Sequence, residues 1–203
     1  MIPELEKKVA AVLPAGEALV GAFRVERTEE GDGSVPRRRR PKVLGGRGGV
    51  GDVVARFFRF FYCVVTTDVP ALQIPTVSDD PAQRERRQRK KGLFFGTWEG
   101  MAGRWMAAGQ PRCMPGVNTV VAVTEGHLRF VYVQCARLSG KLGAVETGAV
   151  FRRGDLVWTR RHNTAGDMQF GFADGSWATL TVPGFQDLVR VFPGTLAPKD
   201  PIP

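Results

Sequence analysis

The chain has 203 residues, of which 43% are hydrophobic and 24% are charged, and its net charge is +9. These proportions are ordinary for a soluble globular protein, and no window approaches the roughly 18 uninterrupted apolar residues of a transmembrane helix. The three cysteines, Cys63, Cys113 and Cys135, are widely spaced and form no C-x-x-C pair, which argues against a disulfide scaffold or a zinc site and favours a cytoplasmic protein.

Residues 3–13 have the pattern of a short amphipathic helix, with Pro3 suited to its first turn. Its apolar stripe consists of Leu5, Val9, Val12 and Leu13. Pro14 and Gly16 end the helix, and residues 17–25 then have the pattern of a strand. This N-terminal stretch is acidic and amphipathic, so we expect no signal peptide.

Residues 27–116 carry nearly all of the surplus positive charge, with 17 Lys or Arg against 9 Asp or Glu. The first basic run, Arg37–Arg40 with Lys42, contains no acid, and its flanking prolines and like charges predict an extended or mobile segment. A second basic run occupies residues 84–91. A basic region within an otherwise nearly neutral chain favours binding to an acidic surface over chemistry.

Two apolar segments lie between and after these basic runs. Residues 52–65 are expected to form a helix that passes into extended chain, and residues 93–109 a second helix with few charges. Gly46–Gly51 matches G-x-G-x-x-G, but a dinucleotide site needs a preceding strand in a parallel sheet, so we interpret this match as a hinge. No Walker lysine follows it, which excludes a phosphate-binding P-loop.

The pattern then changes to three strand–turn–strand units. Strands are expected at 117–124, 128–134, 148–151, 155–161, 168–172 and 177–182. The Asp174-Gly175 pair in the last turn is a strong hairpin signal. The pattern of residues 185–192 predicts a final helix, and residues 195–203 are expected to form a flexible, proline-rich tail.

The stretch Val121–Phe130 reads VAVTEGHLRF and resembles the opening hairpin of bacterial pleckstrin-homology-like proteins, with His127 where their pattern has arginine. Gly171–Ser176 resembles a late hairpin of the same family, and residues 3–25 its lead-in. The resemblance implies an α+β fold, with an antiparallel sheet or small barrel closed by a C-terminal helix. It also implies a domain formed by residues 1–26 and 117–194, interrupted by a partly helical basic insertion at 27–116. Members of this family generally bind membranes or other proteins without catalysis.

Catalysis and metal binding find little support in the sequence. The only histidines, His127 and His162, lie at a predicted turn and a strand end, where a surface role is the simpler interpretation. Asp167 and Asp174 are expected to shape turns. Because no His/Cys/Asp cluster has ligand spacing, we predict no enzyme activity, no metal and no cofactor.

The binding residues we therefore predict belong to the two basic runs, with aromatic residues as apolar anchors. The bases are Arg37, Arg38, Arg39, Arg40, Lys42, Arg84, Arg86, Arg87, Arg89, Lys90 and Lys91. The anchors are Phe57, Phe58, Phe60, Phe61, Trp98 and Trp105. They are expected to dock the protein on an anionic membrane face or an acidic partner protein, as a cytoplasmic or peripheral membrane protein.

Two alternative interpretations fit the same residues. Large apolar side chains are usually buried, so both apolar segments could instead form a helical hairpin packed on the sheet, with the basic runs as solvated loops. Nucleic acid is the competing ligand, because Arg and Lys neutralise phosphates and exposed aromatic rings stack on bases.

Overall fold

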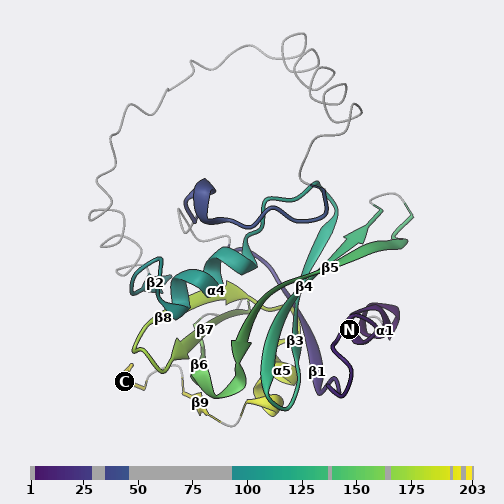
Figure 1. Cartoon of the computed structure of the whole chain (residues 1–203). Coiled ribbons are helices and arrows are strands. Elements are labelled where there is room, and N and C mark those ends of the chain that lie inside the picture. Colours follow the sequence, from purple (N-terminus) through teal and green to yellow (C-terminus); the bar gives the residue numbers. More distant parts are fainter. Residues whose placement is uncertain are drawn as a thin grey trace, which may run out of the picture.

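The computed structural model describes residues 3–28, 35–45, 93–136, 139–162, 166–192, 194–197 and 200–202. Helices α1 (Pro3–Ala10), α4 (Met101–Gly109) and α5 (Phe185–Val191) accompany two β-sheets in this part of the chain (Figure 1). The α+β class expected from the sequence is confirmed, and the final helix lies where it was predicted.

The first sheet is an antiparallel sheet of four strands, in the spatial order β1-β3-β4-β5. Its strands are β1 (Gly21–Val25), β3 (Val117–Val123), β4 (His127–Cys135) and β5 (Leu142–Arg152). The predicted hairpin between β3 and β4 is present, with Val121 opposite Phe130. Strand β5 is longer than the strand expected at 148–151. Its small and polar residues show no clear alternation of apolar and polar positions, and most of them are exposed or half-buried, so the sequence did not indicate the whole strand.

The second sheet has the order β2-β8-β7-β6-β9 and is mixed, because β9 runs parallel to β6. Its strands are β2 (Phe94–Phe95), β6 (Leu156–Arg161), β7 (Asp167–Phe172), β8 (Trp177–Thr181) and β9 (Thr195–Leu196). The β7–β8 hairpin forms around Asp174-Gly175 as predicted, and Gly175 has a φ of 75°.

The hairpin expected between residues 148–151 and 155–161 is wrong. Strand β5 pairs with β4, whereas β6 pairs with β7, so the chain changes sheet at this point. The 3₁₀ turn η2 (Arg153–Asp155) redirects it, and the Asp155 carboxylate accepts a hydrogen bond from the Arg152 N–H at 3.2 Å. Local sequence there signals a turn, but not which strand the next segment will pair with.

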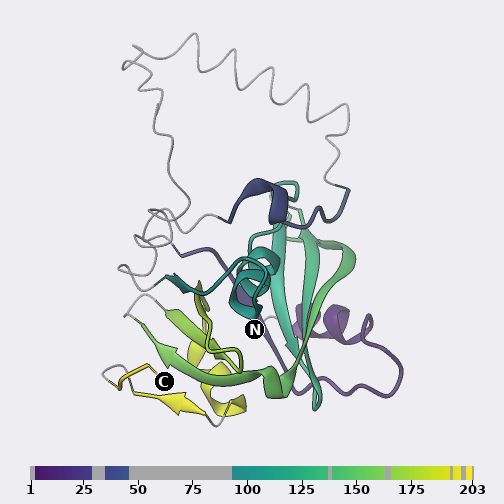
Figure 2. The same cartoon turned by 60° about the vertical axis from the view of Figure 1, so that its left-hand side comes forward.

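Both faces of the four-stranded sheet are covered at β3, which explains why residues 120–123 are all buried. Helix α1 lies on the side away from the second sheet, and Leu5 and Val9 pack there with Val120 and Val131 (Figure 1). The opposite face, with Val121 and Phe130, packs against α4 and the second sheet (Figure 2).

Trp105 of α4 occupies the centre of this core and is 1% exposed. Its ring centroid lies 4.8 Å from that of Phe130 and 5.2 Å from those of Phe151 and Phe170. The expectation that Trp105 anchors the protein in a membrane is therefore wrong, because its side chain has no surface to offer. Trp105 packs in the core, as expected if the apolar side chains of this segment are buried.

The helix expected at 93–109 begins only at Met101, and its first residues instead form β2, which pairs with β8. Gly96 has a φ of 123° and lies against Ser176, which turns the chain from the strand toward the helix. The region expected to be an insertion therefore contributes β2 and α4 to the fold. Val35 and Val43, from the same region, are 1% and 3% exposed.

Candidate functional site: an anchored arginine turn

The first basic run is an ordered turn rather than the extended or mobile segment expected from its charge. Arg37–Arg39 form the 3₁₀ turn η1, which follows Pro36 with a φ of −53°. The buried Val35 and Val43 hold the two ends of the turn in the core. We refer to residues 36–42 as the arginine turn; it lies at the end of the molecule opposite α5 (Figures 1 and 2).

Hydrogen bonds to distant parts of the chain fix the arginine turn at both ends. The Val35 N–H donates to Oε1 of Gln110 at 3.3 Å, just after α4. On the other side, the Arg112 N–H donates to the Pro41 carbonyl at 2.7 Å, and the Val43 N–H donates to the Arg112 carbonyl at 3.2 Å. These bonds offset the like-charge repulsion that would otherwise extend the segment.

The arginine turn forms one side of an open groove of about 630 Å³, which we call the arginine groove. It is lined by Arg38, Arg39, Trp98, Glu99, Arg104 and Ala107. Arg39 forms an ion pair with Glu99, and its hydrogen bond holds the pKa of that carboxyl below the usual range. The remaining cations of the groove, Arg38 and Arg104, are exposed.

The other basic residues of the turn differ in exposure. Arg37 and Lys42 are exposed to solvent, as Arg38 is. Arg40 is half-buried, and its Nε donates to the Val35 carbonyl at 2.8 Å, so this side chain closes the turn. Arg39 and Arg40 therefore stabilise the structure of the turn, whereas Arg37, Arg38 and Lys42 are the bases that can contact a ligand.

The groove brings together residues that are far apart in the sequence. Trp98, one of the predicted anchors, is half-buried and stacked on Phe94, with centroids 4.6 Å apart and planes at 11°. Sequence reasoning missed Arg104, whose guanidinium carbon lies 5.5 Å from the Phe151 ring centroid. The sequence did offer one signal for Arg104, because it is the only basic residue in the apolar run 93–109.

The other predicted binding residues lie outside the described part of the chain. These are Arg84, Arg86, Arg87, Arg89, Lys90, Lys91, Phe57, Phe58, Phe60 and Phe61. The glycine-rich motif at 46–51 also lies there. Their predicted role in binding therefore stays a prediction.

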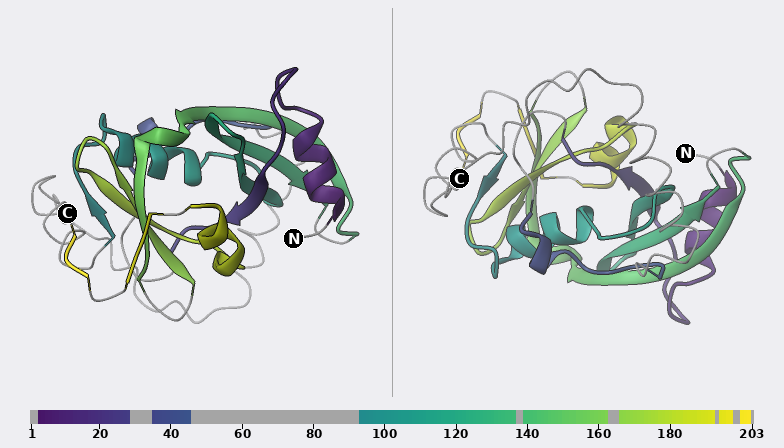
Figure 3. Two further views of the ribbon diagram at one scale, coloured as in Figure 1. Left: turned by 90° about the horizontal axis from the view of Figure 1, so that it is seen from below. Right: turned by 90° about the horizontal axis from the view of Figure 1, so that it is seen from above.

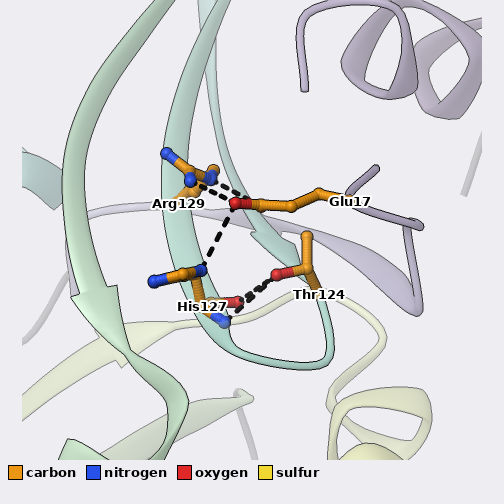
Figure 4. Close-up of polar contacts among 4 residues, drawn as sticks. All are labelled: Glu17, Thr124, His127 and Arg129. Atoms are coloured by element: carbon orange, nitrogen blue, oxygen red, sulfur yellow. Dashed lines mark hydrogen bonds and ion pairs between the residues drawn. The ribbon is translucent and has the colours of Figure 1, made fainter. Parts of the chain in front are cut away.

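A second polar cluster lies beside the β3–β4 turn (Figure 4). Arg129 donates to both carboxylate oxygens of Glu17, at 2.8 and 2.5 Å, and Nδ1 of His127 lies 3.3 Å from Oε1. The hydrogen bond from Arg129 lowers the pKa of Glu17. Because both oxygens are engaged, we interpret this cluster as a clamp that fixes the lead-in segment on β4.

Within the described residues, no three His, Cys, Asp or Glu side chains are grouped so that they could hold a metal ion. No helix in the same part of the chain has the length and hydropathy needed to cross a membrane. Comparisons with protein-family models, with curated proteins and with solved structures give no match for this chain.

Proposed function

We propose that this protein is a non-enzymatic docking module that binds an anionic membrane surface through its arginine turn. The observation that carries the proposal is the anchoring of five basic residues, with no acid among them, between two buried valines. In this proposal Arg37, Arg38 and Lys42 meet the surface, with Arg104 beside them. The bases at 84–91 reinforce the same attraction.

Two physical arguments support membrane docking. A basic side chain near an anionic bilayer contributes roughly 1 kcal/mol, so a handful of them gives useful, salt-sensitive binding. A turn that is already ordered loses little conformational entropy when it binds, and guanidinium groups match phosphate oxygens in geometry. Because Trp105 is buried and Trp98 half-buried, the proposed attraction is mainly electrostatic.

The order of the elements supports a pleckstrin-homology-like fold as part of the proposal. A four-strand antiparallel sheet is followed by the strands β6, β7 and β8 and by the closing helix α5. Proteins of this kind generally act as binding modules at membranes or on other proteins. The large excursion between β1 and β3 would then be the part specific to this chain.

The test uses the whole protein and sedimentation with lipid vesicles. Vesicles of phosphatidylcholine with phosphatidylglycerol should carry the protein into the pellet, and vesicles of phosphatidylcholine alone should not. Binding should weaken as salt is raised, because exposed charges are screened within about 8 Å at physiological ionic strength. Equal binding to both vesicles, or none to either, would refute membrane docking.

Two competition arms separate the membrane from other acidic ligands. Duplex DNA and a polyglutamate peptide are added at the phosphate or carboxylate concentration of the vesicles. Membrane docking predicts that the protein stays with the vesicles in both mixtures. Transfer to DNA would instead favour the nucleic-acid alternative, and transfer to polyglutamate would favour an acidic protein partner.

A further inference from the structure

The arginine groove contains two arginines that come from separate elements of the fold. Arg38 belongs to the turn η1 and Arg104 to helix α4, and both line the groove. The turn lies beside α4 in the view from above (Figure 3). Both side chains are exposed, and within the described residues neither guanidinium group forms a hydrogen bond or an ion pair. Both are therefore available to a ligand in the groove.

The elements that carry these two arginines are fixed by the core beneath them. Arg104 precedes Trp105, which is 1% exposed, and its guanidinium carbon lies 5.5 Å from the centroid of the Phe151 ring. Arg38 is the middle residue of η1, and Val35 just before this turn is buried. Because both cations project from ordered elements, the protein loses little conformational entropy when a ligand binds them.

The charge of the groove suits a doubly charged anion. Its lining has three arginines and one glutamate, so its net charge is +2. Arg39 and Glu99 form an ion pair, which leaves the charges of Arg38 and Arg104 for a ligand. The hydrogen bond from Arg39 is the largest influence that lowers the pKa of Glu99, and the charge of Arg38 lowers it less. A phosphate monoester carries about −1.5 to −2 at pH 7, and so matches this groove better than a singly charged phosphodiester does.

We propose that the arginine groove seats one phosphate monoester headgroup of a membrane lipid, with Arg38 and Arg104 donating to its oxygens. This inference rests on the proposed docking at the membrane, and adds to the general attraction a defined seat for one headgroup. A guanidinium group donates two parallel hydrogen bonds to phosphate oxygens. A tetrahedral phosphate offers oxygens to both arginines, whereas a planar carboxylate has only two. The half-buried Trp98 forms an apolar wall of the seat.

The test compares two kinds of phosphatidylcholine vesicle with equal zeta potential, so that the general electrostatic attraction is the same for both. One kind contains phosphatidic acid, a phosphate monoester, and the other contains phosphatidylglycerol, a phosphodiester. The whole protein should partition at least about tenfold more strongly onto phosphatidic acid. A ratio near one, with salt-sensitive binding to both, would overturn the seat and leave the proposed docking intact. Binding to neither would refute the docking itself, and the seat with it.

Arginine-to-lysine variants separate a phosphate seat from charge alone. Arg38→Lys and Arg104→Lys each keep the positive charge but lose the paired N–H groups that contact two phosphate oxygens. In each variant the preference for phosphatidic acid should fall by at least about threefold. Arg190→Lys, the same exchange at an exposed position on α5, is the control and should keep the preference of the original protein. An unchanged preference in both groove variants would contradict the seat.

Glycerol phosphate distinguishes a membrane lipid from a soluble phosphate ester, because it is the water-soluble counterpart of the phosphatidic acid headgroup. At the phosphate concentration of the vesicles, it should release little of the bound protein. The membrane also attracts Arg37 and Lys42, which a small ligand in the groove does not engage. Release of most of the protein at this concentration would overturn a lipid as the occupant and favour a soluble phosphate ester.

Discussion

Replacement of Asp174 by alanine should destabilise the fold through helix α4, although Asp174 lies in the β7–β8 turn. One carboxylate oxygen of Asp174 accepts the Met101 N–H at 2.9 Å, and the other accepts the Ser176 N–H at 3.0 Å. Ser176 in turn accepts the Ala102 N–H at 3.1 Å. The β7–β8 turn thus satisfies two of the first N–H groups of α4, the helix that holds Trp105 in the core.

The expected cost follows from these bonds. Loss of a helix N-cap costs about 0.5–2 kcal/mol, and hydrogen bonds to a charged acceptor contribute about 1.5–3 kcal/mol each. Because Asp174 is exposed, water can replace part of the stabilisation that these hydrogen bonds provide. We therefore expect Asp174→Ala to lower the free energy of unfolding by about 1–2 kcal/mol. Ser176→Ala should cost about 1 kcal/mol, since one neutral acceptor is lost.

Urea denaturation followed by Trp fluorescence measures this difference. Asp187→Ala is the matched control, because Asp187 is exposed and its only described partner is Arg190 at 3.4 Å. The effect of this control on the free energy of unfolding should stay within about 0.5 kcal/mol.

Burial raises the pKa of Asp174, but hydrogen bonds from Ser176 and Met101 outweigh this and leave the pKa below its usual value. The stabilisation should therefore be present at neutral pH and be lost as the pH falls through the pKa of the folded state. An Asp174→Ala protein as stable as the control at pH 7 would refute this account of α4.

Three further predictions concern the core and the clamp. Trp105→Ala should lower the free energy of unfolding by about 3–5 kcal/mol in the same denaturation experiment, because it empties the centre of the core. Gly171→Ala should cost about 1–3 kcal/mol, since its Cβ would lie 1.9 Å from the Trp158 ring; an unchanged midpoint would contradict the packing of β6 on β7. Glu17→Gln should destabilise the protein at pH 7, and calorimetry should find this difference lost as the pH falls below the usual carboxyl range, because Arg129 lowers the pKa of Glu17.

Local signals in the sequence predicted much of the scaffold. The helix at α1, the β3–β4 hairpin, the Asp174-Gly175 hairpin and the closing helix α5 each depend on periodicity or turn chemistry within a few residues. The pleckstrin-homology-like resemblance rests on the same hairpins, and it stays a proposal. These features could be predicted because neighbouring residues decide them.

Features decided by distant contacts could not be predicted in the same way. Helix α4 begins where it does because Asp174, 73 residues along the chain, accepts the Met101 N–H. The arginine turn is ordered because Val35 bonds to Gln110, 75 residues away, and charge composition alone suggested the opposite. The change of sheet after β5 likewise depends on pairing partners rather than on the turn itself.

Membrane partitioning of a variant of the arginine turn tests whether this turn is the docking surface. The triple variant Arg37→Ala, Arg38→Ala and Lys42→Ala removes the exposed bases of the turn. The control variant Lys7→Ala, Arg24→Ala and Arg190→Ala removes the same charge from exposed positions on α1, β1 and α5.

At roughly 1 kcal/mol per base, the turn variant should lose about a hundredfold in its partition coefficient onto phosphatidylglycerol vesicles. The control should change far less, because its bases lie outside the proposed contact. Equal losses in the two variants would mean that net charge alone governs binding, and would contradict a docking surface at the arginine turn.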